Sequence, residues 1–437
     1  MTKRMVKLRV PLCLAMVEIV TGTVGQAVKA FGFAFEETNR AVLGAEEVFV
    51  YLASQAGPDD EVAIQIEYGG YYVRISFTYT NILLPVHVLN ITAVNNPDDV
   101  SSLAEMGLFI AARVCDQVII DKNSPEEAVV HLIIEKRYPD SSPHELPPLP
   151  DRLPDDSIIS PGGHEEMKLA AMRVSLKYGA NIPSFLRFPG KLVDMVEGQE
   201  IRILLATDGK GAVYGCILWK LMKHCIEAFG PYLFISHDTL GVDLVRSMLE
   251  MVSKTGAVCI LIREPTPDVP LSWFEKLPPL TPPPDTDTGM PLQHALPLYR
   301  QLDEDTGSVV VVHPSLAPSV QRWYDLMYLS RQVIISIPAG EKPGPYTSFS
   351  VKMEKERHCA SLSSITIGND AALVLAAHQK LLWEQEIFDI SYEMDLKDEM
   401  EIFLVPVLID SGFSPEYILP WGGTGDLMVW QARERCQ

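Results

Sequence analysis

The residues best suited to chemistry by type and spacing form the stretch Pro420-Trp421-Gly422-Gly423-Thr424-Gly425-Asp426. Successive glycines allow backbone N–H groups to converge on an anion, and the Trp421 ring could wall such a site. Gly422, Gly423 and Gly425 are therefore candidate anion-binding residues. The same stretch also suits a glycine-rich turn between two strands, with Trp421 packed in the core. The sequence leaves both interpretations open.

Histidine and cysteine spacing offers no metal site. The ten histidines include no HxxxH or HxH pair, and the seven cysteines include no CxxC. His224 and Cys225 are adjacent and are expected on a helix, where neighbouring side chains point in different directions. An odd number of cysteines, most of them in apolar runs, argues against a disulfide framework. We therefore expect no metal ligands, and phosphate-loop and nucleophile-elbow motifs are absent as well.

Composition indicates a globular protein with an acidic surface. A length of 437 residues suggests about three domains, and 47% apolar with 21% charged residues excludes a disordered or coiled-coil chain. The net charge of −21 repels phosphate, so no nucleic-acid partner is expected. The apolar run after the basic N-terminus ends at Glu18, too early to span a bilayer. We therefore expect a cytoplasmic protein without a membrane partner.

Proline divides the chain. Residues 139–163 contain seven prolines and residues 265–291 contain nine. Proline lacks a backbone donor and disfavours helix before it, so both stretches are expected to be extended linkers. The predicted domains are then 1–138, 164–264 and 292–437.

Hydrophobic periodicity predicts an α+β first domain, with helices on one face of a largely antiparallel sheet. Its expected elements are a strand at 6–10, helices at 14–31 and 35–54, hairpin strands at 62–66 and 71–77, a helix at 101–114, and strands at 115–121 and 128–136.

The second and third domains share an order of elements without sharing residues, which indicates a structural repeat. The second is expected to have strands at 201–206, 212–219, 232–235 and 257–263 and a helix at 240–254. The third is expected to have strands at 309–312, 333–337, 388–393, 415–419 and 426–431 and helices at 370–386 and 398–411.

Two stretches of the first domain match motifs of a known family: Gly44 to Tyr51 on a helix, and Met106-Gly107-Leu108-Phe109-Ile110 at a helix start. With them, most of residues 5–137 resembles the histidine-kinase-like ATPase domain of the anti-sigma-factor serine kinases. The resemblance places Glu47 on the family glutamate that orients water, and Gly107 and Leu108 on the motif that presents amides to phosphate.

The resemblance also shows losses. Tyr51 falls on the asparagine that holds magnesium in the family, and a phenol supplies no amide oxygen for that ion. The Asp-x-Gly-x-Gly adenine motif has no counterpart in Phe77 to Leu84. The resemblance thus implies an ATPase shape with a degenerate nucleotide site.

The rest of the chain resembles the GNAT acetyltransferase fold. The stretches that carry this resemblance are Ile203 to Gly215, Leu408 to Phe413 and Ile418-Leu419-Pro420. The family holds the acetyl-CoA pyrophosphate with Arg/Gln-x-x-Gly-x-Gly/Ala, of which only Gly241 remains here. Asp238 and Asp243 flank that glycine and would repel a pyrophosphate.

These observations predict an α+β and α/β multidomain protein: an ATPase-like sandwich followed by two GNAT-like mixed-sheet domains. The leading hypothesis is a non-catalytic regulatory or scaffolding pseudoenzyme that binds other proteins, with a homodimer left open. One alternative is an ATP-dependent serine kinase acting through Glu47. The other is an acyl-CoA-binding acetyltransferase-like protein. Neither ATP nor acetyl-CoA is expected to bind tightly.

Overall fold

The computed structural model describes residues 4–82, 84–93, 100–122, 127–140, 146–150, 152–179, 181–280, 295–337 and 343–432. The chain folds into two compact units. Unit 1 consists of Met1–Arg137 with Pro345–Ser350, and unit 2 consists of Tyr138–Gly344 with Val351–Gln437. The described residues form sheets of five, seven, two and five strands. The predicted class, a multidomain protein that mixes α+β and α/β architecture, is confirmed.

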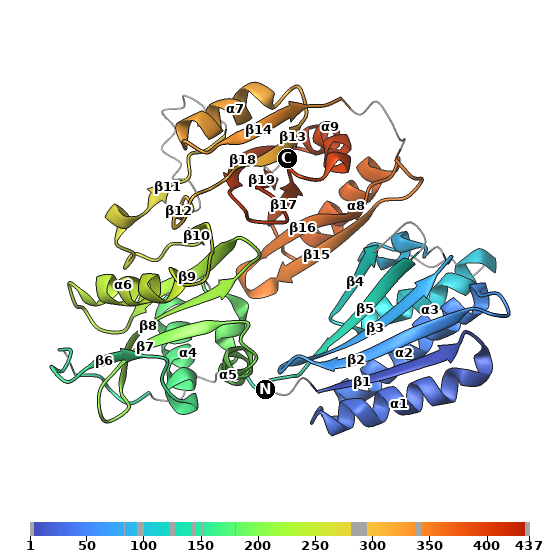
Figure 1. The fold of residues 1–437 in the computed structure, drawn as a ribbon, viewed down its shortest axis with the longest axis horizontal. Coiled ribbons are helices and arrows are strands. Elements are labelled where there is room, and N and C mark those ends of the chain that lie inside the picture. The colour runs from blue at the N-terminus through green and yellow to red at the C-terminus, as the bar shows by residue number, and fades with distance from the viewer. Residues whose placement is uncertain are drawn as a thin grey trace. The chain divides into compact units, whose positions relative to one another are not determined.

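Unit 1 is built on a five-stranded antiparallel sheet in the order β1-β2-β3-β5-β4 (Figure 1). Its strands are β1 (Met5–Pro11), β2 (Glu61–Tyr68), β3 (Tyr72–Thr80), β4 (Gln117–Lys122) and β5 (Glu127–Glu135). Val62, Ile64 and Ile66 alternate with more exposed neighbours, so one face of β2 is buried. The predicted hairpin around Gly69-Gly70 is confirmed.

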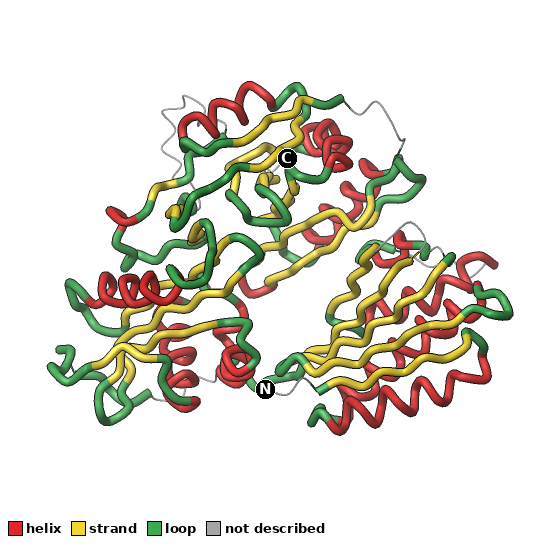
Figure 2. Tube along the Cα trace, viewed as in Figure 1, coloured by secondary structure: helices red, strands yellow, loops and turns green. Residues whose placement is uncertain are grey.

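Helices cover the buried face of this sheet (Figure 2). They are α1 (Val17–Ala30), α2 (Phe35–Gln55) and α3 (Val100–Val114). Val20, Val24 and Val28 recur at helical spacing on α1 and are all fully buried, as the periodicity predicted. The α+β arrangement expected for this part of the chain is therefore correct.

The seven-stranded sheet of unit 2 has the order β11-β12-β10-β9-β8-β7-β6. Its strands are β6 (Ile158–Ser160), β7 (Arg202–Thr207), β8 (Val213–Leu221), β9 (Cys225–Leu233), β10 (Cys259–Ile262), β11 (Glu275–Lys276) and β12 (Leu298–Gln301). Only the β9·β10 pair is parallel among these described strands. Its crossover helix is α6 (Leu240–Val252).

Both faces of this sheet are covered, because successive residues of β7 belong to different cores. Leu204 packs in the core with α6, whereas Ile203 packs in the core with α4 (His164–Tyr178) and α5 (Pro189–Glu197). A strand buried on both faces reads as a continuous apolar run, as Ile203 to Ala206 does.

Several details differ from the sequence prediction. The sheet reaches beyond 164–264, because β6 lies in the first proline-rich stretch, β11 in the second, and β12 beyond it. A short edge strand needs few backbone donors, so proline nearby does not prevent it. The helix expected at His224 and Cys225 is wrong: Cys225 begins β9 and pairs with Cys259.

The second sheet of unit 2 has five strands in the order β15-β16-β17-β19-β18. They are β15 (Ser348–Glu354), β16 (Cys359–Thr366), β17 (Asp389–Asp395), β18 (Phe413–Leu419) and β19 (Leu427–Ala432). Its helices are α8 (Ala371–Glu384) and α9 (Leu404–Asp410). Before this sheet in the chain come β13 (Ser308–Val312), α7 (Ala317–Leu326) and β14 (Arg331–Ile335). The described 3₁₀ turns are η1 (Leu14–Met16), η2 (Val86–Leu89), η3 (Ser184–Arg187), η4 (Leu271–Trp273), η5 (Lys355–Arg357) and η6 (Glu399–Phe403).

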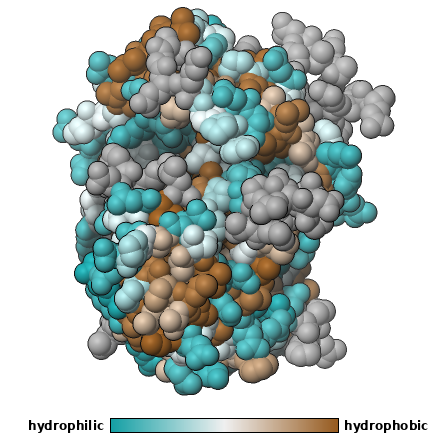
Figure 3. All heavy atoms as spheres, turned by 90° about the vertical axis from the view of Figure 1, so that its right-hand side faces the viewer, coloured by the Kyte–Doolittle hydropathy of each residue, from teal (hydrophilic) through white to brown (hydrophobic). Residues whose placement is uncertain are grey.

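The two large sheets of unit 2 share one topology. Each sheet contains two parallel strands joined by a helix: β9-α6-β10 in one and β16-α8-β17 in the other. In each, the next two strands form a hairpin, and the second strand of that hairpin pairs with the last strand of the crossover. The predicted repeat of element order is therefore confirmed. On the face drawn in Figure 3, apolar side chains gather in patches between polar ones.

Candidate functional site

In unit 1, α2 and α3 bring two of the predicted nucleotide residues together. A Cβ atom added at Gly107 on α3 would lie 2.6 Å from Oε2 of Glu47 on α2. The missing side chain at Gly107 thus lets the carboxyl group lie against α3. Partial burial, with Glu46 nearby, raises the pKa of Glu47. Leu108 is part of the apolar core and contributes packing.

Two tyrosines fill the interior near this pair. Tyr51 lies one helical turn after Glu47 and is 7% exposed, and Tyr79 on β3 is 2% exposed. Burial raises the pKa of both hydroxyl groups, so both stay protonated near neutral pH.

A cavity beside α2 and α3 is apolar and small. It measures about 10 Å³ and is lined by Val48, Leu84, Pro85, Val86, Leu89, Leu108, Ala111, Val118, Ile120 and Val130. Such a volume holds about one water molecule, whereas small-molecule sites usually measure roughly 300–1,000 Å³. This cavity is therefore too small for a nucleotide.

The opposite face of the unit 1 sheet carries a hydrogen-bonded serine, histidine and aspartate that the sequence analysis missed. The Ser76 hydroxyl lies 2.7 Å from Nδ1 of His131, and Nε2 of His131 lies 3.1 Å from Oδ2 of Asp121. The three residues stand on the adjacent strands β3, β5 and β4. The backbone N–H groups around them belong to the strand ladders, so no oxyanion site accompanies the serine among the described residues. The arrangement fits cross-strand pairing better than acyl transfer.

In the seven-stranded sheet, Gly241 lies in the first turn of α6. A Cβ atom there would lie 2.6 Å from the carbonyl oxygen of Asp268, so the glycine permits close approach by the chain that follows β10. The N–H groups of Thr239 and Leu240, at the start of α6, donate to Nδ1 of His237 over 3.4 and 3.2 Å. His237 therefore takes up two of the N–H groups at the helix start where an anion would bind.

The parallel strands β9 and β10 separate after three paired positions, Cys225 to Glu227 on β9. The segment after β10 and helix α4 satisfy the backbone of β9 beyond that point. The Thr266 hydroxyl donates to the Pro231 carbonyl over 2.6 Å. The Tyr178 hydroxyl accepts from the N–H of Leu233 over 2.8 Å and lies 2.6 Å from Oδ2 of Asp268. The gap between the strands is thus closed by residues of the protein itself.

The glycine-rich turn between β18 and β19 folds around two carboxylates. Asp395 accepts from the Thr424 N–H and hydroxyl over 2.8 and 2.7 Å, and Asp426 accepts from the Trp421 N–H over 2.9 Å. The Gly422 and Gly423 N–H groups donate to Leu419 and Gly425 carbonyls. The turn is a hairpin turn, and internal acceptors hold these N–H groups.

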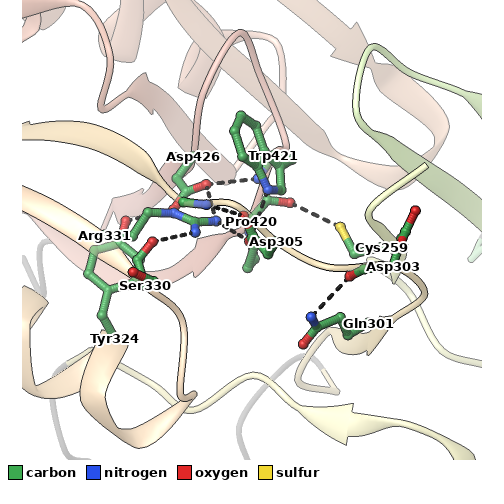
Figure 4. Close-up of polar contacts among 11 residues, drawn as sticks. Cys259, Gln301, Asp303, Asp305, Tyr324, Ser330, Arg331, Pro420, Trp421 and Asp426 are labelled. Atoms are coloured by element: carbon green, nitrogen blue, oxygen red, sulfur yellow. Dashed lines mark hydrogen bonds and ion pairs between the residues drawn. The ribbon is translucent and has the colours of Figure 1, made fainter. Parts of the chain in front are cut away.

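Asp426 also belongs to a buried ion cluster (Figure 4). Arg331 Nε donates to Asp426 Oδ2 over 2.7 Å, and Arg331 Nη2 donates to Asp305 Oδ2 over 2.9 Å. The Arg331 and Asp426 side chains have no exposed surface. Tyr324 donates its hydroxyl to Asp426, and Trp421 donates its indole N–H to Asp305. Burial and full pairing indicate a structural role that fixes β14 against the turn.

A buried carboxyl group joins the separating strands of the second sheet. The β16·β17 pairing ends at Leu362 and Tyr392. Beyond it, Glu401 on η6 accepts from the Ser364 hydroxyl on β16 and, over 2.7 Å, from the Tyr392 hydroxyl on β17. Burial raises the pKa of Glu401 to about 7, although both hydrogen bonds act in the opposite direction. Glu401 is also among the residues that line an apolar cavity of about 10 Å³.

Glu401 was missed by sequence reasoning, although it stands between the apolar residues Met400 and Ile402. A charged residue directly before the apolar run Ile402 to Val405 was the available signal. The residues predicted from the sequence are dispersed: Gly241 lies in helix α6, which packs on the seven-stranded sheet, and Gly422, Gly423 and Gly425 lie in the turn between β18 and β19. Among the described residues, Glu47 and Gly107 lie in contact, and the three glycines lie together in one turn.

No group of three or more His, Cys, Asp or Glu side chains in the described ranges is placed to hold a metal ion. None of the helices described has both the length and the apolar character needed to cross a membrane.

Comparison with known proteins yields only distant likenesses. No family model and no curated protein matches the chain. A GNAT-family acetyltransferase from Staphylococcus aureus Mu50 is 14% identical over 34% of this chain and 99% of its own, with a TM-score of 0.25. A phosphinothricin acetyltransferase from Sinorhizobium meliloti in complex with AcCoA is 16% identical over 35% and 91%, with a TM-score of 0.25. PaiA N-acetyltransferase from Thermoplasma acidophilum in complex with coenzyme A is 18% identical over 33% and 98%, with a TM-score of 0.24. At these values the likenesses establish neither a family nor an activity.

Proposed function

We propose that this protein is a non-catalytic regulatory or scaffolding protein that acts by binding other proteins. One observation carries the proposal: side chains and backbone of the protein itself bond to, or pack against, the groups that would bind a ligand. His237 and the Asp268 backbone hold the start of α6, Asp395 and Asp426 hold the glycine-rich turn, and Tyr51 stands where the ATPase resemblance requires an asparagine.

Thermal unfolding with small ligands tests this proposal. The full chain is heated with Mg-ATP, ADP, acetyl-CoA or CoA, and a ligand at 100 times its dissociation constant should stabilise the folded state by about 2.7 kcal/mol. We expect no shift with any of the four. A shift with Mg-ATP would favour the serine kinase alternative, and a shift with a CoA compound would favour the acyl-CoA alternative. Either result would contradict the proposal.

A matched variant sharpens the nucleotide test. Tyr51→Asn supplies the amide oxygen that a divalent cation accepts and removes the buried ring. If Tyr51 is what blocks nucleotide, Tyr51→Asn should show a Mg-dependent shift with ATP that the parent chain lacks. Glu47→Gln in the Tyr51→Asn background serves as control, because it leaves the amide ligand in place.

One observation favours a second candidate, acyl transfer in the five-stranded sheet of unit 2. A general base works best with a pKa near the operating pH, and the pKa of Glu401 is about 7. Glu401 also joins the two separating strands through Ser364 and Tyr392. Transfer from acetyl-CoA to a panel of amines, lost in Glu401→Gln, would support this candidate over the non-catalytic one.

A further inference from the structure

The segment 308–337 concentrates exposed apolar side chains. β13, α7 and β14 form a two-stranded parallel sheet with one helix (Figure 1). The exposed large apolar residues in this segment are Val309, Leu326, Tyr328, Ile334, Ile335 and Ile337, with exposures from 41% to 94%. Exposed apolar surface commonly marks an interaction site where its side chains form one patch.

The backbone of β14 indicates what kind of partner fits. Ser336 donates its N–H to Val312 on β13, so alternate residues of β14 face β13. The N–H and C=O groups of Val333 and Ile335 therefore point to the other edge. Within the described part of the chain, nothing outside the β13·β14 ladder bonds to these two residues. An edge with unpaired groups and β-branched side chains is a template for one more strand.

The charge of this segment is compatible with a second copy of the chain as the partner. The whole chain carries −21, but the charges of residues 308–337 nearly cancel: Arg331 is buried and paired with Asp305 and Asp426, which leaves Arg322 against Asp325 (1 − 1 = 0). Two copies would therefore meet at this edge with little local repulsion, although they repel elsewhere. An antiparallel strand pair is also self-complementary about a two-fold axis, the commonest symmetry of protein dimers.

We infer that β14 pairs with β14 of a second copy of this chain, antiparallel, to form a continuous four-stranded sheet. This inference goes beyond the proposed function and does not depend on it. Ile334 and Ile335 would then be covered by the same side chains of the other copy. A strand pair this short buries less than the roughly 1,600 Å² of a standard interface, so the dimer is weak. Salt screens the repulsion between the acidic bodies and should strengthen it.

Sedimentation velocity of the full chain tests the inference, from about 1 to about 100 µM at low and high salt. We expect a concentration-dependent dimer that tightens as salt is raised. Hydrogen exchange of the peptide that contains β14 should slow as the protein concentration rises, because the Val333 and Ile335 N–H groups become bonded. A wild-type chain that stays monomeric at the highest concentration would overturn the inference.

Two variants localise the contact. Val333→Pro removes an N–H that faces the open edge, and edge strands tolerate proline there. Ile335→Asp places like charges across the two-fold axis and serves if the proline variant unfolds. Both should be monomeric with native circular dichroism. Leu373→Asp, on the exposed side of α8, is the control and should dimerise like the parent. A dimer that survives Val333→Pro and Ile335→Asp would contradict the β14 assignment.

Discussion

The two large sheets of unit 2 share a topology but close their separating parallel strands by different means. Between β9 and β10, backbone and neutral hydroxyl groups fill the gap: Thr266 bonds Pro231, and Tyr178 bonds Leu233. Between β16 and β17, one carboxyl group, that of Glu401, bonds a hydroxyl on each strand. The same order of strands therefore has one gap closed by tyrosine and threonine hydroxyl groups that bond the backbone, with Asp268 beside the tyrosine, and the other closed by a buried carboxyl group whose pKa is raised to about 7.

The two sheets also differ in how they are anchored. The turn that closes the five-stranded sheet is fixed by the buried pair Arg331 and Asp426. In the seven-stranded sheet, α6 packs on the apolar core and His237 accepts from N–H groups at the start of that helix. We therefore expect the five-stranded sheet to respond to charge and pH, and the seven-stranded sheet to respond to loss of hydrogen bonds.

The largest effect is expected from Asp426→Ala. It leaves Arg331 buried with one carboxylate in place of two, and breaking a buried ion pair costs about 3–5 kcal/mol. The free energy of unfolding is measured by urea denaturation. Asp395→Ala is the control, because Asp395 holds the same turn from a more exposed position and should cost about 1 kcal/mol. Equal costs would show that burial of the charge is unimportant.

Protonation of Glu401 should give the next largest effect. Its pKa is raised from 4.5 to about 7, so the folded state holds this proton more tightly than the unfolded state does. Stability contributed by the protonated form is present below pH 4.5 and falls as pH rises to about 7, by about 3 kcal/mol. The free energy of unfolding, measured from pH 4.5 to 8 for the parent and for Glu401→Gln, gives this contribution as a difference. Parallel pH profiles would rule it out.

Tyr178→Phe tests the seven-stranded sheet. It removes the hydroxyl that the buried Leu233 N–H requires, and an unsatisfied buried donor costs about 1–3 kcal/mol. The control is Tyr299→Phe on β12, because the buried Tyr299 hydroxyl has no hydrogen-bond partner among the described residues. That control should be neutral or slightly stabilising. If both variants lose the same stability in urea, the Tyr178 hydroxyl does not close the gap.

The smallest effect is expected from His237→Ala. The side chain accepts from two N–H groups at the start of α6, and loss of an N-terminal cap costs about 1 kcal/mol. Ser236→Ala in the same exposed turn is the control and should change the melting temperature little. A cost well above that of Tyr178→Phe would reverse the order proposed for this sheet.

Local pattern was enough to predict most elements. The alternation of Val62, Ile64 and Ile66 fixes which face of β2 is buried, since a strand repeats every two residues. Helices α1 and α2 followed from helical spacing, and the strands around the Pro420 to Asp426 turn followed from glycine between apolar runs. Short strands such as β6 and β11 escaped prediction, because two or three residues carry no period.

The family resemblances predicted one pair of neighbouring residues and left the ligand roles as predictions. Placing Glu47 on the family glutamate and Gly107 on the phosphate motif led to two residues that the structure brings into contact. The ligand roles of these residues, of Gly241 and of the three glycines in the turn remain predictions. A motif is read from neighbours in the chain, whereas a ligand site depends on which other segments occupy it.

The sequence by itself determined the periodic elements, their order, the repeat within unit 2 and the acidic surface. Tertiary structure alone decided the clusters, because their members come from distant segments: Ser76 with His131, Glu401 with Ser364, and Arg331 with Asp426. Strand register and crossover packing set these pairings, and a shift of one residue would turn each side chain to the other face. No local periodicity encodes that choice, since it follows from how whole sheets and helices bury their apolar faces together.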